Sequence, residues 1–211
     1  MKKLAIFDMD GTLIDSSTTL VNAINYVRKN LRLPPMGEDE ILLKLNDHSI
    51  NPSQYFYNSP NFKAEHEVWF SKYYRENHNR EIRLYSGVKE LLERLKSRGF
   101  KLAIATNAYR NSTNQALHHL DIGYFFDSIV CGDEVRYSKP YPDMLEKVLY
   151  ETKIDREDAI FIGDGERDQE ASKRANIDYI MVHWGFSDHR EEDAVGSLEE
   201  LEKKILENYL Y

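Results

Sequence analysis

Short apolar runs, each four residues long, punctuate an otherwise polar chain. They occupy residues 4–7, 102–105, 159–162 and 179–182, with a weaker fifth run at residues 128–131. The runs are unbroken, contain β-branched or aromatic residues, and are bounded by Gly, Asp or Asn. Such runs are typical of strands buried on both faces of a sheet. Each run is far shorter than the roughly 20 apolar residues that cross a bilayer, so we expect no membrane segment.

Segments with helical periodicity separate these runs. Residues 88–95 place four apolar side chains on one stripe, and we expect Ser86 to cap this helix and Gly99 to end it. Ser197 and Glu200 are spaced as in a capping box and predict the start of a C-terminal helix. The alternation of strands and helices predicts an α/β fold with a doubly wound parallel sheet. Ligands bind such sheets beyond the carboxyl ends of the strands.

Residues 16–85 break this alternation, because they show a helical pattern without a convincing buried strand. The stretch holds 10 of the 25 aromatic residues, and its 9 basic and 8 acidic side chains give it a charge of +1, against −9 for the rest. We therefore expect a core of residues 1–15 and 86–211 with an inserted helical subdomain of residues 16–85. The spacing of Trp69, Phe70, Tyr73 and Tyr74 predicts that they form the interior of that subdomain.

Composition narrows the function classes. The chain has 211 residues and a net charge of −8 without a basic run, which argues against binding to a nucleic-acid backbone. Cys131 is the single cysteine, so no internal disulfide forms and a reducing compartment is indicated. The apolar stretch after Lys2 and Lys3 stops at Asp8, which is too short for a signal peptide, and we expect a cytoplasmic protein. No pattern in the sequence indicates an oligomeric state.

Polar clusters follow the predicted strands, each close to the point where a strand ends. They are Asp8-Met9-Asp10-Gly11-Thr12, Thr106-Asn107, Lys139-Pro140 and the segment 163–168, which contains Asp164 and Asp168. The carboxyl ends of parallel strands meet at one edge of a sheet, so we expect all four clusters to converge in space.

Convergence of Asp8, Asp10, Asp164 and Asp168 would bring four carboxylates together. Such a cluster is unfavourable unless a cation neutralises it or a pKa rises. Oxygen ligands favour a hard divalent ion, and Mg²⁺ typically takes a few carboxylates together with substrate phosphate oxygens. Gly11 allows a tight turn whose backbone N–H groups face an anion.

The remaining polar residues complete a phosphate site. Thr106, Asn107 and Lys139 supply a hydroxyl, an amide and a positive charge. Phosphoryl transfer requires positioning, an in-line nucleophile and charge neutralisation, all of which this set provides.

Together the four clusters resemble the four motifs of the haloacid dehalogenase superfamily, in matching order and spacing over essentially the whole chain. Within it, the sequence is most similar to the phosphoglycolate phosphatase-like branch, which has a small helical cap. The resemblance implies a Rossmann-like core, the cofactor Mg²⁺ and a small phosphorylated metabolite as substrate.

The same resemblance implies a role for each motif residue. Asp8 would be the nucleophile that forms an aspartyl-phosphate, and Asp10 the general acid and base. The metal would be held by Asp8, the main-chain carbonyl of Asp10 and Asp164, with Asp168 as a further ligand or support. Thr106, the backbone of Asn107, and Lys139 would bind the phosphoryl group.

Some positions depart from the family pattern. The segment after Asn107 reads Ala-Tyr-Arg where many relatives have a lysine, and the cap loop at residues 45–48 reads Leu-Asn-Asp-His where a glycine is common. His48 in this loop is a candidate substrate contact. Phosphoglycolate is the default substrate of the resemblance, while pyrophosphate, sugar phosphates and nucleoside monophosphates stay open. The alternative functions are a phosphomutase that shares the four motifs and a non-catalytic binder of phosphorylated ligands; a dehalogenase would not need Asp10.

Overall fold

Five strands form one parallel sheet in the computed structural model, which describes residues 3–45, 50–185 and 193–207. The strands are β1 (Leu4–Phe7), β4 (Lys101–Thr106), β5 (Ser128–Cys131), β6 (Ala159–Gly163) and β7 (Asp178–Met181). Their order is β5-β4-β1-β6-β7, and all neighbours pair in parallel. All five predicted runs are strands, although the last ends at Met181 because Val182 pairs instead with Val195 in an isolated bridge. The predicted α/β fold is confirmed.

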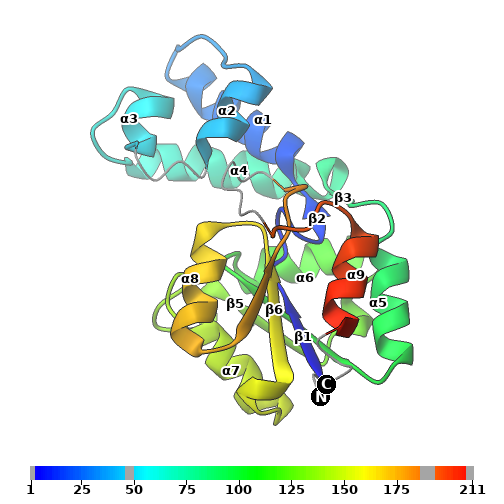
Figure 1. The fold of residues 1–211 in the computed structure, drawn as a ribbon. Helices are drawn as coiled ribbons and strands as arrows, with labels where there is room; N and C mark the ends of the chain where they lie inside the picture. The colour runs from blue at the N-terminus through cyan, green and yellow to red at the C-terminus, as the bar shows by residue number, and fades with distance from the viewer. Residues whose placement is uncertain (1–2, 46–49, 186–192, 208–211) are drawn as a thin grey trace.

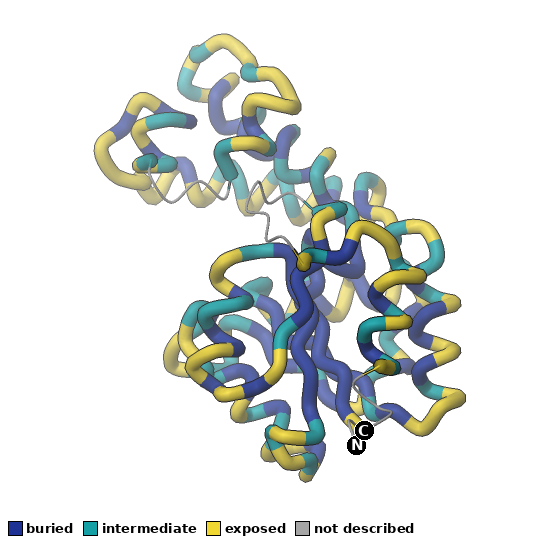
Figure 2. Tube along the Cα trace, in the orientation of Figure 1, coloured by how far each residue is buried: buried dark blue, intermediate teal, exposed yellow. Residues whose placement is uncertain are grey.

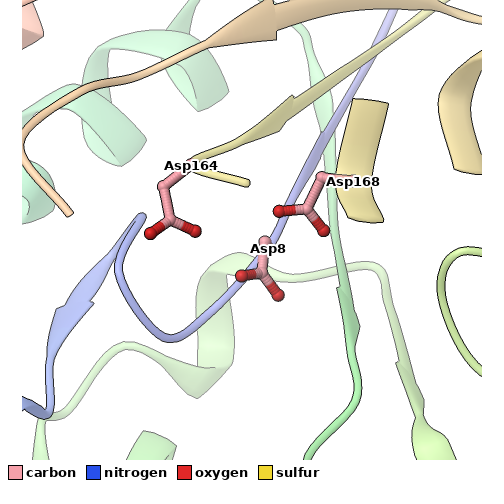
Figure 3. Close-up of side chains that lie close together, drawn as sticks. All are labelled: Asp8, Asp164 and Asp168. Atoms are coloured by element: carbon pink, nitrogen blue, oxygen red, sulfur yellow. The ribbon is translucent and has the colours of Figure 1, made fainter. Parts of the chain in front are cut away.

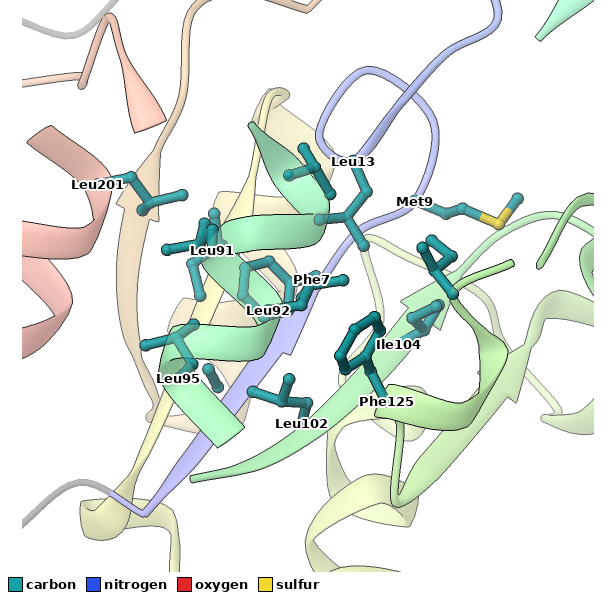
Figure 4. Packing of buried hydrophobic residues seen from close by; sticks show 14 of the residues in the cluster. Phe7, Met9, Leu13, Leu91, Leu92, Leu95, Leu102, Ile104, Phe125 and Leu201 are labelled. Atoms are coloured by element: carbon teal, nitrogen blue, oxygen red, sulfur yellow. The ribbon is translucent and has the colours of Figure 1, made fainter. Parts of the chain in front are cut away.

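Helices cover both faces of this sheet (Figure 1). The helices are α5 (Val88–Ser97), α6 (Arg110–His119) and α9 (Leu198–Glu207) on one face, and α7 (Asp143–Thr152) and α8 (Glu166–Ala175) on the other. Single turns of 3-10 helix occur at Gly123–Phe125, Gly132–Glu134 and Arg156–Asp158. Phe7 of β1 packs among the buried residues on the face covered by α5, where Figure 4 shows it against that helix. Ile6 packs on the opposite face, against residues of α7 and α8. Burial of successive side chains on opposite faces explains why the strand sequences are apolar without alternation (Figure 2).

The ends of the core helices follow local backbone geometry. The four apolar residues of α5 are fully buried as expected, but its N-cap is Gly87 and not Ser86. The chain enters this helix with a φ of +90° at Gly87, a conformation that glycine adopts without strain, so the helix begins one residue later than predicted. Gly99 ends the helix with a φ of +84°, as expected. At α9 the Ser197 hydroxyl accepts a hydrogen bond from the backbone N–H of Glu200, while the Glu200 carboxylate accepts one from Gly196.

Four further helices lie over the edge of the sheet where its strands end (Figure 1). They are α1 (Ser17–Asn30), α2 (Glu38–Leu45), α3 (Pro52–Tyr57) and α4 (Ala64–Glu81). They have an apolar cluster of their own, formed by Val21, Ile24, Val27, Ile41, Phe56 and Tyr57. The chain enters and leaves this region through two short antiparallel strands, β2 (Ile14–Asp15) and β3 (Arg83–Leu84). Both connections to the sheet therefore run side by side at one place.

None of the described helices combines the length and the apolar character that a membrane span requires.

Candidate active site

The loop after β1 positions two aspartates. Asp8 directly follows the strand, and its backbone N–H extends the sheet by donating to the carbonyl of Ile162 over 2.8 Å. The chain then turns through Gly11, which has a φ of +81°, and the N–H of Gly11 donates to the carbonyl of Ile14. The predicted tight turn is confirmed, but this N–H is used within the turn and does not face an anion. Asp10 accepts a hydrogen bond of 2.6 Å from the buried hydroxyl of Ser16.

Three carboxylates from two strand ends meet beside this loop. Asp8, Asp164 and Asp168 each place one oxygen within 4.8 Å of the others, and all three residues are buried (Figure 3). Asp164 follows β6, while Asp168 lies in the first turn of α8, where its carboxylate accepts a 3.3 Å hydrogen bond from the N–H of Gly165. The group has the donor chemistry and spacing that a hard divalent cation requires.

Lys139 reaches into the carboxylate group from the segment between β5 and α7. Its Nζ lies 2.6 Å from Oδ1 of Asp8 and 2.7 Å from Oδ1 of Asp168, and its side chain is only 3% exposed. The backbone of Lys139 is held by Asn107, whose Oδ1 accepts from the Lys139 N–H at 3.0 Å and whose Nδ2 donates to the Lys139 carbonyl at 3.1 Å. The Asn107 side chain therefore positions the lysine. Only the backbone of Asn107 remains to bind a ligand.

Burial and charge perturb the titration of these groups. The pKa of Asp8 is raised well above its usual value, first by burial and then by the charges of Asp168 and Asp164, while Lys139 opposes the increase. Burial also raises the pKa of Asp10, against the opposing effects of the Ser16 hydrogen bond and Lys139. Burial alone would lower the pKa of Lys139, but the charges of Asp168 and Asp8 outweigh it and raise this pKa. The three carboxylates of Asp8, Asp164 and Asp168 therefore outnumber the single positive charge of Lys139.

Thr106 completes the set at the end of β4. In the parallel pairing of β1 and β4, Phe7 lies opposite Ile104. Thr106, two residues further along β4, therefore lies within one residue of the position opposite Asp8. The Thr106 side chain is buried, and its Oγ1 accepts a hydrogen bond of 3.1 Å from the N–H of Ala108. The hydroxyl proton is then free to be donated to an anion.

Close packing around Asp164 gives Gly11 a second role and adds Trp184 and Gly185, which belong to none of the four motifs. A Cβ on Gly11 would lie 2.2 Å from Oδ2 of Asp164, and a Cβ on Gly185 would lie 2.3 Å from the same atom and 2.4 Å from the Gly11 carbonyl oxygen. Trp184 secures this contact, because its Nε1 donates to the Thr12 carbonyl over 3.1 Å. The sequence signal for Gly185 was its place four residues after the last strand, at the same edge of the sheet as the motifs.

A cavity of about 450 Å³ opens beside Asp10, between α4 and α6. Phe70 and Tyr74 line it, although Phe70 also packs against the apolar cluster of α1–α3. The prediction that the aromatics form the interior of this region is confirmed for Trp69 and Phe70, which pack against that cluster, while Phe70 and Tyr74 also line the cavity. The loop contact predicted for His48 falls outside the described residues.

Comparisons with known proteins agree with this geometry. A family model described as haloacid dehalogenase-like hydrolase matches residues 5–182. The chain is 32% identical to a phosphoglycolate phosphatase of Aquifex aeolicus, over 87% of this chain and 86% of the relative. It is 30% identical to a pyrophosphatase of Bacillus velezensis, over 85% and 82% of the two chains.

A similar solved structure is that of a predicted phosphatase from Clostridium acetobutylicum, with a TM-score of 0.82 and 27% identity over 98% of this chain and 99% of that one. The resemblance inferred from the four motifs and the expected class of enzyme, a phosphoric monoester hydrolase, are thus confirmed. The chain belongs to the haloacid dehalogenase-like hydrolase family, as a phosphatase of that family.

Proposed function

We propose that this enzyme is a Mg²⁺-dependent phosphatase that hydrolyses a small phosphorylated metabolite through an aspartyl-phosphate on Asp8. One observation carries the proposal: three buried carboxylates converge within 4.8 Å, and Lys139 bridges two of them. A buried carboxylate cluster of this density is unfavourable without a cation, and phosphoryl transfer uses both the cation and the lysine.

The donor set fits Mg²⁺. Asp8 and Asp164 would hold the ion through their carboxylates and Asp10 through its main-chain carbonyl, with Asp168 as a further ligand or support for the others. The close packing of Gly11 and Gly185 against Asp164 restricts where its carboxylate can point, as a small ion with strict geometry requires. Bound Mg²⁺ would neutralise charge on the transferring phosphoryl group.

Asp8 and Asp10 would divide the chemistry between them. An oxygen of Asp8 attacks phosphorus, the bond from phosphorus to the ester oxygen breaks, and Asp10 gives its proton to that leaving oxygen. Water then attacks the phosphorus of the aspartyl-phosphate while Asp10 takes up a proton, and this step releases inorganic phosphate and restores both side chains. The raised pKa of Asp10 favours the protonated form that the first step needs.

Lys139, Thr106 and Asn107 would hold the phosphoryl group. Lys139 neutralises charge on Asp8 and on the phosphate, while the Thr106 hydroxyl and the Asn107 backbone N–H donate to phosphoryl oxygens. Thr106 and Asn107 lie at the end of β4, and the Asn107 side chain holds the backbone of Lys139, so little reorganisation accompanies the reaction.

Residues 16–85 would act as a cap over this site, with residues 1–15 and 86–211 as the catalytic core. The paired strands β2 and β3 are the place where the two parts connect. Closing of a cap excludes water from the reacting groups. Relatives named phosphoglycolate phosphatase and pyrophosphatase support a substrate of small size.

The test is the release of inorganic phosphate from p-nitrophenyl phosphate by the wild type and by Asp8→Asn. We expect activity that requires Mg²⁺, is lost in EDTA, and falls at least about a thousandfold in Asp8→Asn, as loss of a nucleophile does elsewhere. Asp121→Asn is the matched control, since Asp121 is exposed and pairs with Lys89 on the surface. Circular dichroism checks that both variants fold. Unchanged turnover in Asp8→Asn would reject the mechanism, and absence of hydrolysis with every divalent ion would favour a binding protein.

A further inference from the structure

The cavity between α4 and α6 is the place for the part of the substrate that leaves. Asp10 lines this cavity of about 450 Å³. In the proposed function, on which this inference rests, Asp10 gives its proton to the leaving oxygen. The group attached to that oxygen must therefore extend from Asp10, and this cavity offers it room.

One wall of the cavity is a row of stacked rings on α4. Phe70, Tyr74 and His78 recur every four residues and so lie on one face of the helix. The rings of Phe70 and Tyr74 are 6.0 Å apart at 17°, and those of Tyr74 and His78 are 4.3 Å apart at 24°. Burial raises the pKa of Tyr74 well above its usual value, and the charge of Asp10 adds to the effect, which places the tyrosine near the acid. This wall is held in position beside the reacting groups.

Arg75 lines the same cavity next to this wall. Its side chain is exposed, and no described carboxylate lies within ion-pair distance of it. His78 does not supply a second positive charge, because burial, assisted by the charge of His119, lowers its pKa to about 4. Arg75 is therefore the cation that the described residues offer to a ligand in this cavity.

The opposite wall is polar. Asn111, Ser112 and Gln115 of α6 line it, and the side-chain amides of Asn111 and Gln115 can donate to a ligand. An arginine that faces amide donors across a cavity is suited to a carboxylate or a phosphate, which its planar group binds through two parallel hydrogen bonds. A neutral sugar or nucleoside would leave the charge of Arg75 without a partner.

We propose that Arg75 is a specificity-determining residue that binds a second anionic group on the leaving side of the substrate. The substrate class is then small phosphate esters or anhydrides that carry a carboxylate or another phosphate next to the bond that breaks. Arg75 does not touch the reacting atoms, so its effect falls on substrate binding.

The experiment compares charged substrates with counterparts whose leaving group is neutral. Phosphoglycolate carries a carboxylate where 2-hydroxyethyl phosphate carries a neutral alcohol, and inorganic pyrophosphate carries a phosphate where methyl phosphate carries a methyl group. We expect Arg75→Met to lower kcat/KM about ten- to hundredfold, mainly through KM, for one or both charged substrates. The neutral partner should change less than about twofold. The arm in which the loss occurs tells whether the anion is a carboxylate or a phosphate.

Two further variants separate charge from structure. Arg75→Lys keeps the charge and should recover part of the affinity for the charged substrate. Arg80→Met removes another exposed arginine of the same helix that does not line the cavity, and it should leave all four substrates unchanged.

Equal losses on charged and neutral substrates, or a wild type that prefers the neutral partner, would overturn the assignment of Arg75. Failure of the wild type to hydrolyse any of the four substrates would instead overturn the proposed function, and Asp8→Asn in the same assay confirms that the measured turnover comes from this site.

Discussion

Replacement of Lys139 by methionine tests the electrostatic balance of the site. Methionine keeps the length and the apolar stem of the side chain, including the packing near Phe161, but removes the charge that lies 2.6 Å from Asp8 and 2.7 Å from Asp168. Because the lysine side chain is only 3% exposed, water cannot replace it. The two carboxylates are then left buried and repel each other.

Removing one partner of a buried ion pair costs about 3–5 kcal/mol in measured cases. We expect the free energy of unfolding of Lys139→Met to fall by about that amount in EDTA, as measured by urea denaturation. Saturating Mg²⁺ should reduce the difference, because a cation that binds only the folded site stabilises it. The kcat should fall about 10²- to 10³-fold, since a preorganised positive charge is lost and the pKa of Asp8 rises further.

Lys147→Met is the control for this experiment. Lys147 also pairs with a carboxylate, Glu151, but over 3.9 Å and with a side chain that is 34% exposed. Surface pairs of this kind contribute less than about 1 kcal/mol, so stability and activity should be nearly unchanged. If Lys139→Met were as stable in EDTA as Lys147→Met, the buried carboxylates would not need the lysine, and the reasoning would be wrong.

Two other substitutions probe the packing and the titration of the molecule. Gly185→Ala adds a Cβ 2.3 Å from Oδ2 of Asp164, so we expect the Mg²⁺ concentration for half-maximal activity to rise at least about tenfold, because overpacking typically costs about 1–3 kcal/mol. Gly37 has open space around it, so the control Gly37→Ala should behave like the wild type. An unchanged Mg²⁺ dependence in Gly185→Ala would contradict the close packing described for Asp164. His78→Phe keeps the ring stacking but removes a group whose pKa is lowered to about 4, against about 6.5 in the unfolded chain. Below pH 6.5 the unfolded wild type binds a proton that the folded protein does not bind until about pH 4, so the wild type should lose about 2 kcal/mol more stability than His78→Phe between pH 7 and pH 5. Equal losses in urea titrations would refute the assignment.

The motifs predicted the centre of the site because their positions follow from sheet topology alone. Each lies where a strand ends, and parallel strands deliver their carboxyl ends to the same edge. Asp8 and Asp164 accordingly meet, although β1 and β6 are far apart in the sequence. The expected role of Lys139 as a neighbour of Asp8 agrees with the ion pair, while its second partner, Asp168, was not anticipated.

Details of the site that depend on side-chain contacts could not be predicted in this way. Asn107 belongs to a recognised motif, yet its side chain holds the backbone of Lys139, which is a hydrogen-bond pattern between distant segments. Gly185 belongs to no motif, and its need for a hydrogen side chain comes only from the closeness of Asp164 and Gly11. The N-cap of α5 at Gly87 was missed because a left-handed residue before a helix depends on how the chain arrives from β3.

The sequence by itself determined the sheet, the order of its motifs and the convergence of three of the four predicted carboxylates, because local runs of residues fix the burial and the direction of the strands. The carboxylate of Asp10 is not in this group and accepts a hydrogen bond from Ser16. Only the tertiary structure decided how the helices α1–α4 lie over the edge of the sheet, and hence that Arg75 and the ring of Tyr74 share a cavity with Asp10. That placement results from packing between segments distant in the chain, and the pattern of apolar positions in a helix shows that it has a buried face without showing which surface the face meets.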